Sequence, residues 1–198
     1  MIALTESGGG VSIYRLKITL KGSNPPIWRR ILVRADTKLE RLHRMLQPVM
    51  GWGNCHLHQY HIRAGFKQTT YCIPDPNFQS WGCKMHDERR YTIGDLLKAP
   101  KRKIYYEYDF GDSWIHDVVL EKILPPDPAF KYPVCLAGAN ACPPEDCGGL
   151  WGYYNLLKVL KDPAHQEHAA LKEWIGGESD PTLFDLEGIN AALKRMKA

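Results

Sequence analysis

The densest group of polar and aromatic side chains lies at residues 108–116, which read YDFGDSWIH. Asp109 and Asp112 flank a glycine, and His116 follows Trp114 by two residues, so His116 and Trp114 share one face of a strand. Two carboxylates and an imidazole can bind a cation or transfer protons in acid–base catalysis. The alternative is structural, because aspartates often accept backbone N–H groups at turns and the histidine can be a hydrogen-bonded core residue.

A second concentration of chemically active groups lies at residues 142–149, CPPEDCGG. The two prolines stiffen the backbone, and the two glycines permit positive φ or a close approach. We predict that this segment folds back onto residues 108–116, so that acids from both segments and one imidazole form a carboxylate–histidine cluster: Asp109, Asp112, His116, Glu145 and Asp146. The alternative is a rigid loop whose acids lie near the N-terminus of the next helix, where the macrodipole favours negative charge.

The chain has six cysteines, and no two of them form a Cys-x-x-Cys pair. Cys135, Cys142 and Cys147 have the spacing Cys-x6-Cys-x4-Cys, which binds zinc if His116 supplies the fourth ligand. Two further groups of candidate metal ligands are Cys55, His56, His58 and His61, and Cys72, Cys83 and His86. In the first of these groups, strand alternation separates His61 from the other two histidines.

Charge is distributed unevenly along the chain, whose formal net charge is +4. Residues 1–103 carry 18 basic and 7 acidic side chains, whereas residues 104–198 carry 8 and 15. Six cations are concentrated in one segment of the basic half: Arg29, Arg30, Arg34, Lys38, Arg41 and Arg44. With Trp28 and Trp52 nearby, they can follow a phosphate backbone and stack bases. The alternatives are an ordinary solvated face and attraction between the two halves within one fold.

The composition is typical of a soluble globular protein, with 44% hydrophobic and 24% charged residues among 198. No apolar run is long enough for a membrane span, and the first residues lack the pattern of a signal peptide. We therefore expect a cytoplasmic protein with reduced thiols and no membrane partner. One α+β domain over residues 12–198 is expected, with residues 1–11 as a flexible tail.

The candidate residues must be positioned by a sheet that begins in the first third of the chain. Residues 12–21 alternate between apolar and polar side chains, which predicts a half-buried strand, and residues 27–33 predict a second. A helix follows, beginning at a capping box of Thr37 and Glu40 and ending at Gly51. A third strand at residues 56–62 completes the order strand, strand, helix, strand, which is the opening of a β-grasp fold.

The rest of the chain is expected to extend this sheet and cover it. Residues 104–110 and 114–123 predict a hairpin, which adds to one mixed sheet. A strand near residues 69–73 and a short helix at 92–98 are expected, with a loop at 74–90. Residues 125–149 predict a long connection. Three helices then pack on the sheet, at residues 152–161, from 162 to about 176, and from 180 or 185 onward.

Four segments together resemble the plasmid pRiA4b ORF-3-like family, also known as a passenger protein family of insertion elements. They are residues 27–31 (IWRRI), Trp52 with residues 56–60 (HLHQY), residues 108–116, and residues 142–149 followed by Gly152 and Tyr153. The resemblance covers residues 14–196 and implies an α+β domain with a β-grasp-like first half. It implies no established activity, and it suggests an association with mobile elements.

Two functions follow from these observations. The first is an accessory module that binds nucleic acid or a protein partner through the basic first half. The second is a metal-assisted hydrolase or phosphoryl-transfer enzyme that uses the carboxylate–histidine cluster around a divalent cation or zinc.

Overall fold

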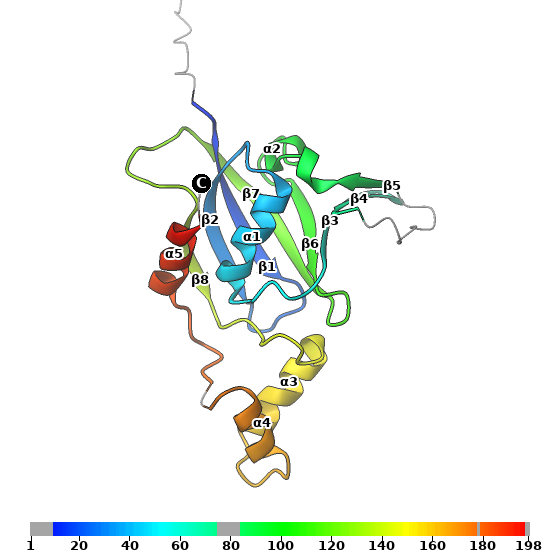
Figure 1. Cartoon of the computed structure of the whole chain (residues 1–198), viewed down its shortest axis with the longest axis vertical. Coiled ribbons are helices and arrows are strands. Elements are labelled where there is room, and N and C mark those ends of the chain that lie inside the picture. The colour runs from blue at the N-terminus through cyan, green and yellow to red at the C-terminus, as the bar shows by residue number, and fades with distance from the viewer. Residues whose placement is uncertain (1–9, 75–83, 178, 197–198) are drawn as a thin grey trace, which may run out of the picture.

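The computed structural model describes residues 10–74, 84–177 and 179–196. Its centre is an eight-stranded sheet with the order β5-β4-β3-β6-β7-β1-β2-β8 (Figure 1). The strands are β1 (Ile13–Leu20), β2 (Trp28–Arg34), β3 (His58–Ala64), β4 (Lys67–Cys72), β5 (Lys84–Asp87), β6 (Lys103–Tyr108), β7 (Trp114–Leu124) and β8 (Val134–Ala139). Only β4 and β5 pair in parallel; the other neighbours are antiparallel. The predicted α+β class with a mixed sheet is confirmed.

Alternation along β1 builds the middle of the core. Tyr14, Leu16, Ile18 and Leu20 are buried on one face, while the residues between them are half-exposed on the other. β1 lies between β2 and β7, and the predicted hairpin of β6 and β7 is confirmed. This hairpin separates β3 from β1, so the third strand of the first half pairs with β6.

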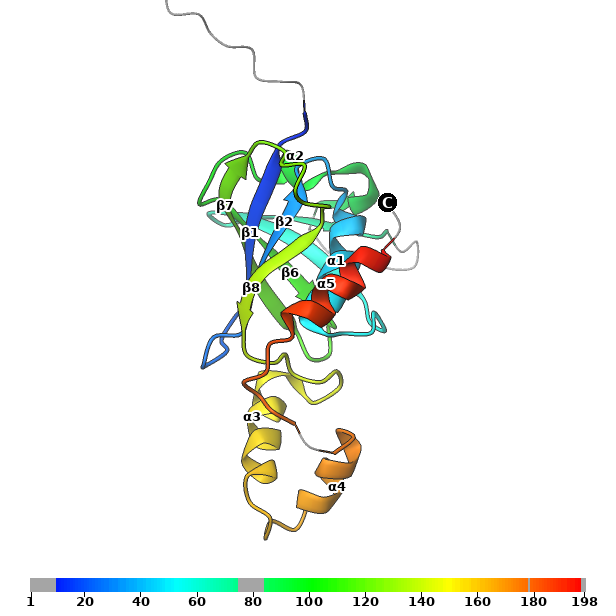
Figure 2. The same ribbon diagram turned by 90° about the vertical axis from the view of Figure 1, so that its left-hand side faces the viewer.

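The described helices that cover the sheet lie on one of its faces (Figure 2). They include α1 (Leu39–Met50), η1 (Glu88–Arg90), α2 (Ile93–Leu96) and α5 (Leu186–Arg195). α1 buries an apolar stripe on the sheet, and α5 packs against β8 and α1. Gly51 ends α1 in the left-handed conformation, φ 88°, and its N–H donates to the Gln47 carbonyl.

The other two C-terminal helices extend beyond the end of the sheet (Figure 1). α3 (Gly149–Leu160) reaches the core through Tyr153 near its start, and α4 (His168–Trp174) packs against α3. Only α5 among the three C-terminal helices therefore packs along the sheet. In the described part of the chain, no helix has the length and apolar character needed to cross a membrane.

The predicted capping box of Thr37 and Glu40 is wrong. The N-cap of α1 is Lys38, without a side-chain cap, because residues 91–93 run beside this segment. The Leu39 N–H donates to the Tyr91 carbonyl, which satisfies the helix start with backbone. A capping box does form at α2, between Thr92 and Asp95.

Two predicted loops contain structure. Residues 74–90 include β5 and η1, and the connection at 125–149 includes β8. β5 and β8 are the two edges of the sheet, each pairing with one neighbour. Short edge strands have little periodicity of their own, so their pairing depends on β4 and β2.

Candidate functional site

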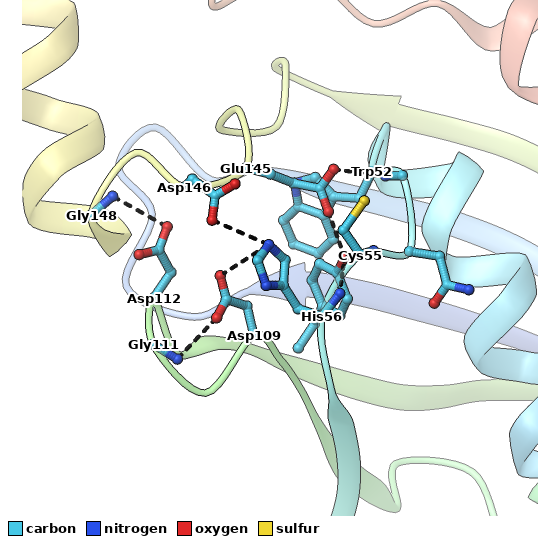
Figure 3. Close-up of polar contacts among 12 residues, drawn as sticks. Trp52, Cys55, His56, Asp109, Gly111, Asp112, Glu145, Asp146 and Gly148 are labelled. Atoms are coloured by element: carbon cyan, nitrogen blue, oxygen red, sulfur yellow. Dashed lines mark hydrogen bonds and ion pairs between the residues drawn. The ribbon is translucent and has the colours of Figure 1, made fainter.

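Three loops meet at one end of the sheet (Figure 3). They connect α1 to β3, β6 to β7, and β8 to α3. The structure thus brings the turn at residues 109–113 and the segment at 142–149 together, and the Gly148 N–H donates to Asp112 Oδ2 over 3.2 Å. The end of β6, the start of β7 and the start of α3 position these loops.

An imidazole and two carboxylates face one another where the loops meet. His56 Nε2 lies 3.2 Å from Asp146 Oδ1 and 3.7 Å from Asp109 Oδ2. One ligand atom from each of the three residues lies within 4.8 Å of the others. His56 Nε2 is buried and makes no hydrogen bond in the structure. The three potential metal ligands therefore face one point, and His56 Nε2 forms no regular hydrogen bond with either carboxylate.

The backbone of the β6–β7 turn holds Asp109 in place. Asp109 has φ 57° and Ser113 has φ 53°, both left-handed. Asp109 Oδ1 accepts the Gly111 N–H over 2.9 Å, as the structural interpretation of the turn predicts. The other carboxylate oxygen of Asp109 faces His56. Asp109 therefore closes the turn with one oxygen and presents the other to the cluster.

Glu145 connects two of the loops through hydrogen bonds. Its Oε1 accepts a hydrogen bond from the Tyr108 hydroxyl, and its Oε2 accepts the Gly53 N–H over 2.8 Å. The Tyr108 oxygen in turn accepts the Cys55 N–H over 2.9 Å. Burial, and then the bond to Glu145, raise the pKa of Tyr108. Glu145 therefore positions the loops, and both of its oxygens are engaged.

His116 does not join the carboxylates of the predicted carboxylate–histidine cluster. It is completely buried on β7, its ring centroid lies 5.3 Å from that of Trp52, and Nδ1 lies 3.3 Å from the Tyr106 carbonyl oxygen. Burial lowers its pKa to about 4. His56 takes the place predicted for His116. The sequence groups His56 with other candidate ligands, and no local spacing links it to Asp109 and Asp146.

The predicted zinc site of Cys135, Cys142, Cys147 and His116 does not form. Cys135 Sγ lies 3.7 Å from the Ala137 carbonyl oxygen, Cys142 Sγ accepts from Arg29, and Cys147 Sγ lies 3.9 Å from the Gly149 carbonyl oxygen. Burial raises the pKa of Cys142 to about 11 and of Cys147 to about 12, which keeps both as thiols. Five cysteines are free in the described residues: Cys55, Cys72, Cys135, Cys142 and Cys147.

The other candidate metal groups are dispersed. His58 lies 2.9 Å from Glu88 and stacks on His43, whereas His61 stacks on Tyr105. His86 Nδ1 lies 2.8 Å from the Tyr91 hydroxyl, and Cys83 falls outside the described residues. Within residues 10–74, 84–177 and 179–196, the one group of three or more ligands is His56, Asp109 and Asp146.

The six predicted phosphate contacts do not form one surface. Arg29 is 3% exposed, and its guanidinium donates to the carbonyls of Val49, Trp28 and Ala139. Arg29 lies among buried residues of β2 and stabilises the fold. The prediction that it contacts phosphates is therefore wrong. The others have local partners or line a hollow: Arg30 pairs with Glu121, Arg34 with Asp36 and Arg44 with Glu40, and Lys38 and Arg41 line a hollow of about 400 Å³.

Comparisons with known proteins agree with the fold. The family model described as "Plasmid pRiA4b ORF-3-like protein" matches residues 12–188. An uncharacterized protein, y4hQ, from Sinorhizobium fredii (strain NBRC 101917 / NGR234) is 36% identical over 190 residues, covering 94% of this chain and 93% of that protein. The crystal structure of a protein of unknown function, MM3350 from Methanosarcina mazei Go1, matches with a TM-score of 0.77 and 36% identity, covering 89% of this chain and 97% of that one.

Proposed function

We propose that this chain, which belongs to the plasmid pRiA4b ORF-3-like family, holds a divalent-metal centre that catalyses hydrolysis. The relatives above are described as uncharacterized or of unknown function, so the proposal is argued from the site itself. The observation that supports the proposal is the convergence of His56 Nε2, Asp109 Oδ2 and Asp146 Oδ1 from three separate loops.

The distances from His56 Nε2 to the two carboxylate oxygens suit Zn²⁺ or Mn²⁺. Metal–ligand bonds of about 2.1 Å place neighbouring ligand atoms about 3.0–3.4 Å apart in octahedral or tetrahedral geometry. The distances of 3.2 and 3.7 Å from His56 Nε2 to the two carboxylate oxygens require only small adjustments. One imidazole and two carboxylates also leave coordination positions for water and substrate, as catalytic sites do.

The chemistry of such a centre is the activation of water. His56, Asp109 and Asp146 would hold the Zn²⁺ or Mn²⁺, which would lower the pKa of a bound water toward neutral pH. Asp112 lies on the same turn as Asp109 and uses Oδ2 to accept the Gly148 N–H. As a general base and acid on this turn, Asp112 would take the proton of the attacking water and return it to the leaving oxygen when the ester C–O bond of the substrate breaks.

The surroundings of the site favour a neutral ester or amide over a phosphate ester. Asp109, Asp112, Glu145 and Asp146 bring four carboxylates to the loops, and these repel an anionic substrate. The Asp146 side chain is 70% exposed and lies at a hollow of about 350 Å³. The hollow has apolar walls that include Trp151, Leu156, Leu171 and Trp174. These walls offer a surface for an apolar substrate group beside the metal.

Removal of one ligand is expected to abolish tight metal binding. After treatment with a chelator, the protein should bind one Zn²⁺ or Mn²⁺ per chain in isothermal titration calorimetry. His56→Ala and Asp109→Asn should each weaken the affinity at least about 100-fold, because each removes one of three ligands. Asparagine keeps the oxygen that closes the turn, so Asp109→Asn tests coordination rather than folding. His165→Ala, which removes an imidazole from the α3–α4 connection, should bind like the parent protein. Equal affinities in all four proteins would exclude this site.

Asp112→Asn is expected to separate catalysis from metal binding. With Zn²⁺ or Mn²⁺ bound, this variant should hydrolyse p-nitrophenyl acetate about 100-fold more slowly than the parent while binding the metal with an affinity within a few-fold. The rate should rise with pH as the water ionises. p-Nitrophenyl phosphate should react more slowly than the acetate. A parent protein whose rate is the same with and without metal would contradict the proposal.

A further inference from the structure

A row of cross-strand partners runs over the face of the sheet that the helices leave open. Tyr105 on β6 is paired with Asp117 on β7, Asp117 with Thr19 on β1, and Thr19 with Trp28 on β2. These four strands are adjacent in the sheet (Figure 1). Two aromatic residues therefore lie in one line, three strand spacings or about 14 Å apart.

A row of cations lies directly beside the aromatic row. Lys103 on β6 is paired with Val119 on β7, Val119 with Lys17 on β1, and Lys17 with Arg30 on β2. Because residues two apart on a strand point to the same face, this row and the aromatic row share the open face. Lys17, Arg30 and Lys103 thus lie alongside the line from Tyr105 to Trp28.

The cations of this face lie over the two aromatic rings. Lys17 Nζ lies 5.1 Å and Arg30 Cζ 5.0 Å from the ring centroid of Trp28. Lys103 Nζ lies 4.7 Å from the centroid of Tyr105, and His61 stacks on the same ring with centroids 4.9 Å apart, so a base at Tyr105 competes with these contacts. Glu121 and Asp117 also hold Arg30 and Lys103. A base that stacks on Trp28 displaces Lys17 Nζ from the ring, and this ammonium group can then reach a phosphate.

The open face is basic after its ion pairs are taken into account. Its cations include Arg15, Lys17, Lys21, Arg30, Arg63, Lys103 and Lys122, and its acids include Glu107, Asp117 and Glu121. Glu121 pairs with Arg15 and Arg30, and Asp117 pairs with Lys103. Among these residues the cations exceed the acids by four, and Lys17 and Lys21 contact aromatic rings.

We propose that this open face binds single-stranded nucleic acid, with bases on Tyr105 and Trp28 and phosphates along Lys103, Lys17 and Arg30. The proposal does not rest on the metal centre, which lies in the loops at the end of the sheet. The aromatic row supplies stacking that any base can use, and the cationic row complements the charge of the backbone. A duplex keeps its bases stacked on each other, so a flat face with two rings favours a single strand.

The test uses a fluorescein-labelled oligothymidine and oligouridine of twelve nucleotides in the presence of EDTA, with binding followed by fluorescence anisotropy. At ~50 mM salt the protein should bind both strands, and at ~200 mM salt the affinity should fall by about ten-fold or more. Trp28→Ala should weaken binding about ten-fold, while Trp28→Phe, which keeps a ring, should retain most of the affinity. Lys17→Gln should reduce the salt slope by about 1.

Matched controls make the outcome decisive. Lys194→Gln removes the same charge from α5, on the covered side of the sheet, and should bind like the parent protein. His56→Ala should also bind like the parent, which separates this surface from the metal centre. The proposal is overturned if neither strand binds at ~50 mM salt. Three other results would also overturn it. They are equal losses of affinity for Lys17→Gln and Lys194→Gln, binding by Trp28→Ala as tight as that of the parent protein, and tighter binding of the corresponding duplex than of the single strand.

Discussion

Lowering the pH from 8 to 5 is expected to reduce the free energy of unfolding by about 4 kcal/mol, because two buried histidines stay neutral in the folded protein. Burial, and then the neighbouring His58, lower the pKa of His43 to about 3. Burial lowers the pKa of His116 to about 4. Both residues are almost or fully inaccessible to solvent, at 4% and 0% exposure.

The direction of the effect follows from proton binding. Both pKa values in the folded state lie below about 6.5, the value of an unperturbed histidine, so the unfolded chain binds more protons below that pH. The stability is therefore complete above pH 6.5 and is lost as the pH falls toward 4. At pH 5 each histidine contributes a loss of about 2 kcal/mol. Glu121, whose pKa is lowered by Arg30, adds its loss only at more acidic pH.

The packing around the two histidines explains why they resist protonation. His43 Nδ1 lies 2.7 Å from the Tyr106 hydroxyl. Its Nε2 lies 2.6 Å from Asn54 Oδ1, a contact that raises the pKa but does not outweigh burial. Its ring stacks on His58 with centroids 3.4 Å apart, which disfavours a second positive charge. His116 Nε2 is buried without a hydrogen-bond partner, so a proton there would have no acceptor.

Urea unfolding at pH 8, 7, 6 and 5 measures the effect directly. His116→Phe should remove about 2 kcal/mol of the pH dependence, because it deletes the contribution of that histidine. The dependence that remains comes from His43 and from His61, whose pKa burial also lowers. His165→Ala, at a half-buried site on the α3–α4 connection, should keep the full dependence. A parent protein that is equally stable at pH 8 and pH 5 would show that neither histidine is held neutral.

The interior strands were predictable because their signal is local. The alternation of Tyr14, Leu16, Ile18 and Leu20 predicts both the strand and its buried face. The β6–β7 hairpin was predictable for the same reason, with a glycine turn between two alternating runs. The edge strands β5 and β8 were not, since their formation depends on a neighbour that a local pattern does not identify.

The acids of the candidate site could be identified from the sequence, but its imidazole could not. Asp109 and Asp146 stand out through turn residues and prolines around them. His116 shares a strand face with Trp114, and that alternation already places it with the buried residues Val118 and Leu120. His56 lies in the loop before β3, so its contact with the acids arises only from the tertiary fold.

Charge counts alone also misassigned Arg29. Its neighbours Ile27, Ile31 and Val33 occupy the buried face of β2, and the arginine follows the same alternation. Backbone carbonyls satisfy its guanidinium inside the fold. The face of the sheet on which each cation lies therefore indicates a binding surface better than the number of cations in a segment. Arg30, one residue after Arg29, lies on the open face.

Gly152→Ala is expected to disrupt both the stability of the protein and the metal centre. A Cβ at Gly152 would lie 1.8 Å from the Cys147 carbonyl oxygen, so the backbone before α3 would have to move. The Gly152 N–H also donates to the Gly148 carbonyl over 3.1 Å, which holds this turn closed. We expect the free energy of unfolding to fall by about 3 kcal/mol, as in overpacked sites.

The displacement should also reach Asp146, which precedes Cys147 in the chain. Its Oδ1 lies 3.2 Å from His56 Nε2, and a shift of about 1 Å moves this ligand out of coordination distance. Zn²⁺ affinity should therefore fall about 100-fold in calorimetry under conditions where the variant remains folded. Gly176→Ala is the matched control, because a Cβ there meets nothing within 4 Å and the positive φ of 80° costs only about 1–2 kcal/mol. It should keep the parent affinity. Equal Zn²⁺ affinities of Gly152→Ala and Gly176→Ala would contradict this prediction. They would show that the turn between Gly148 and Gly152 does not position Asp146 as a ligand.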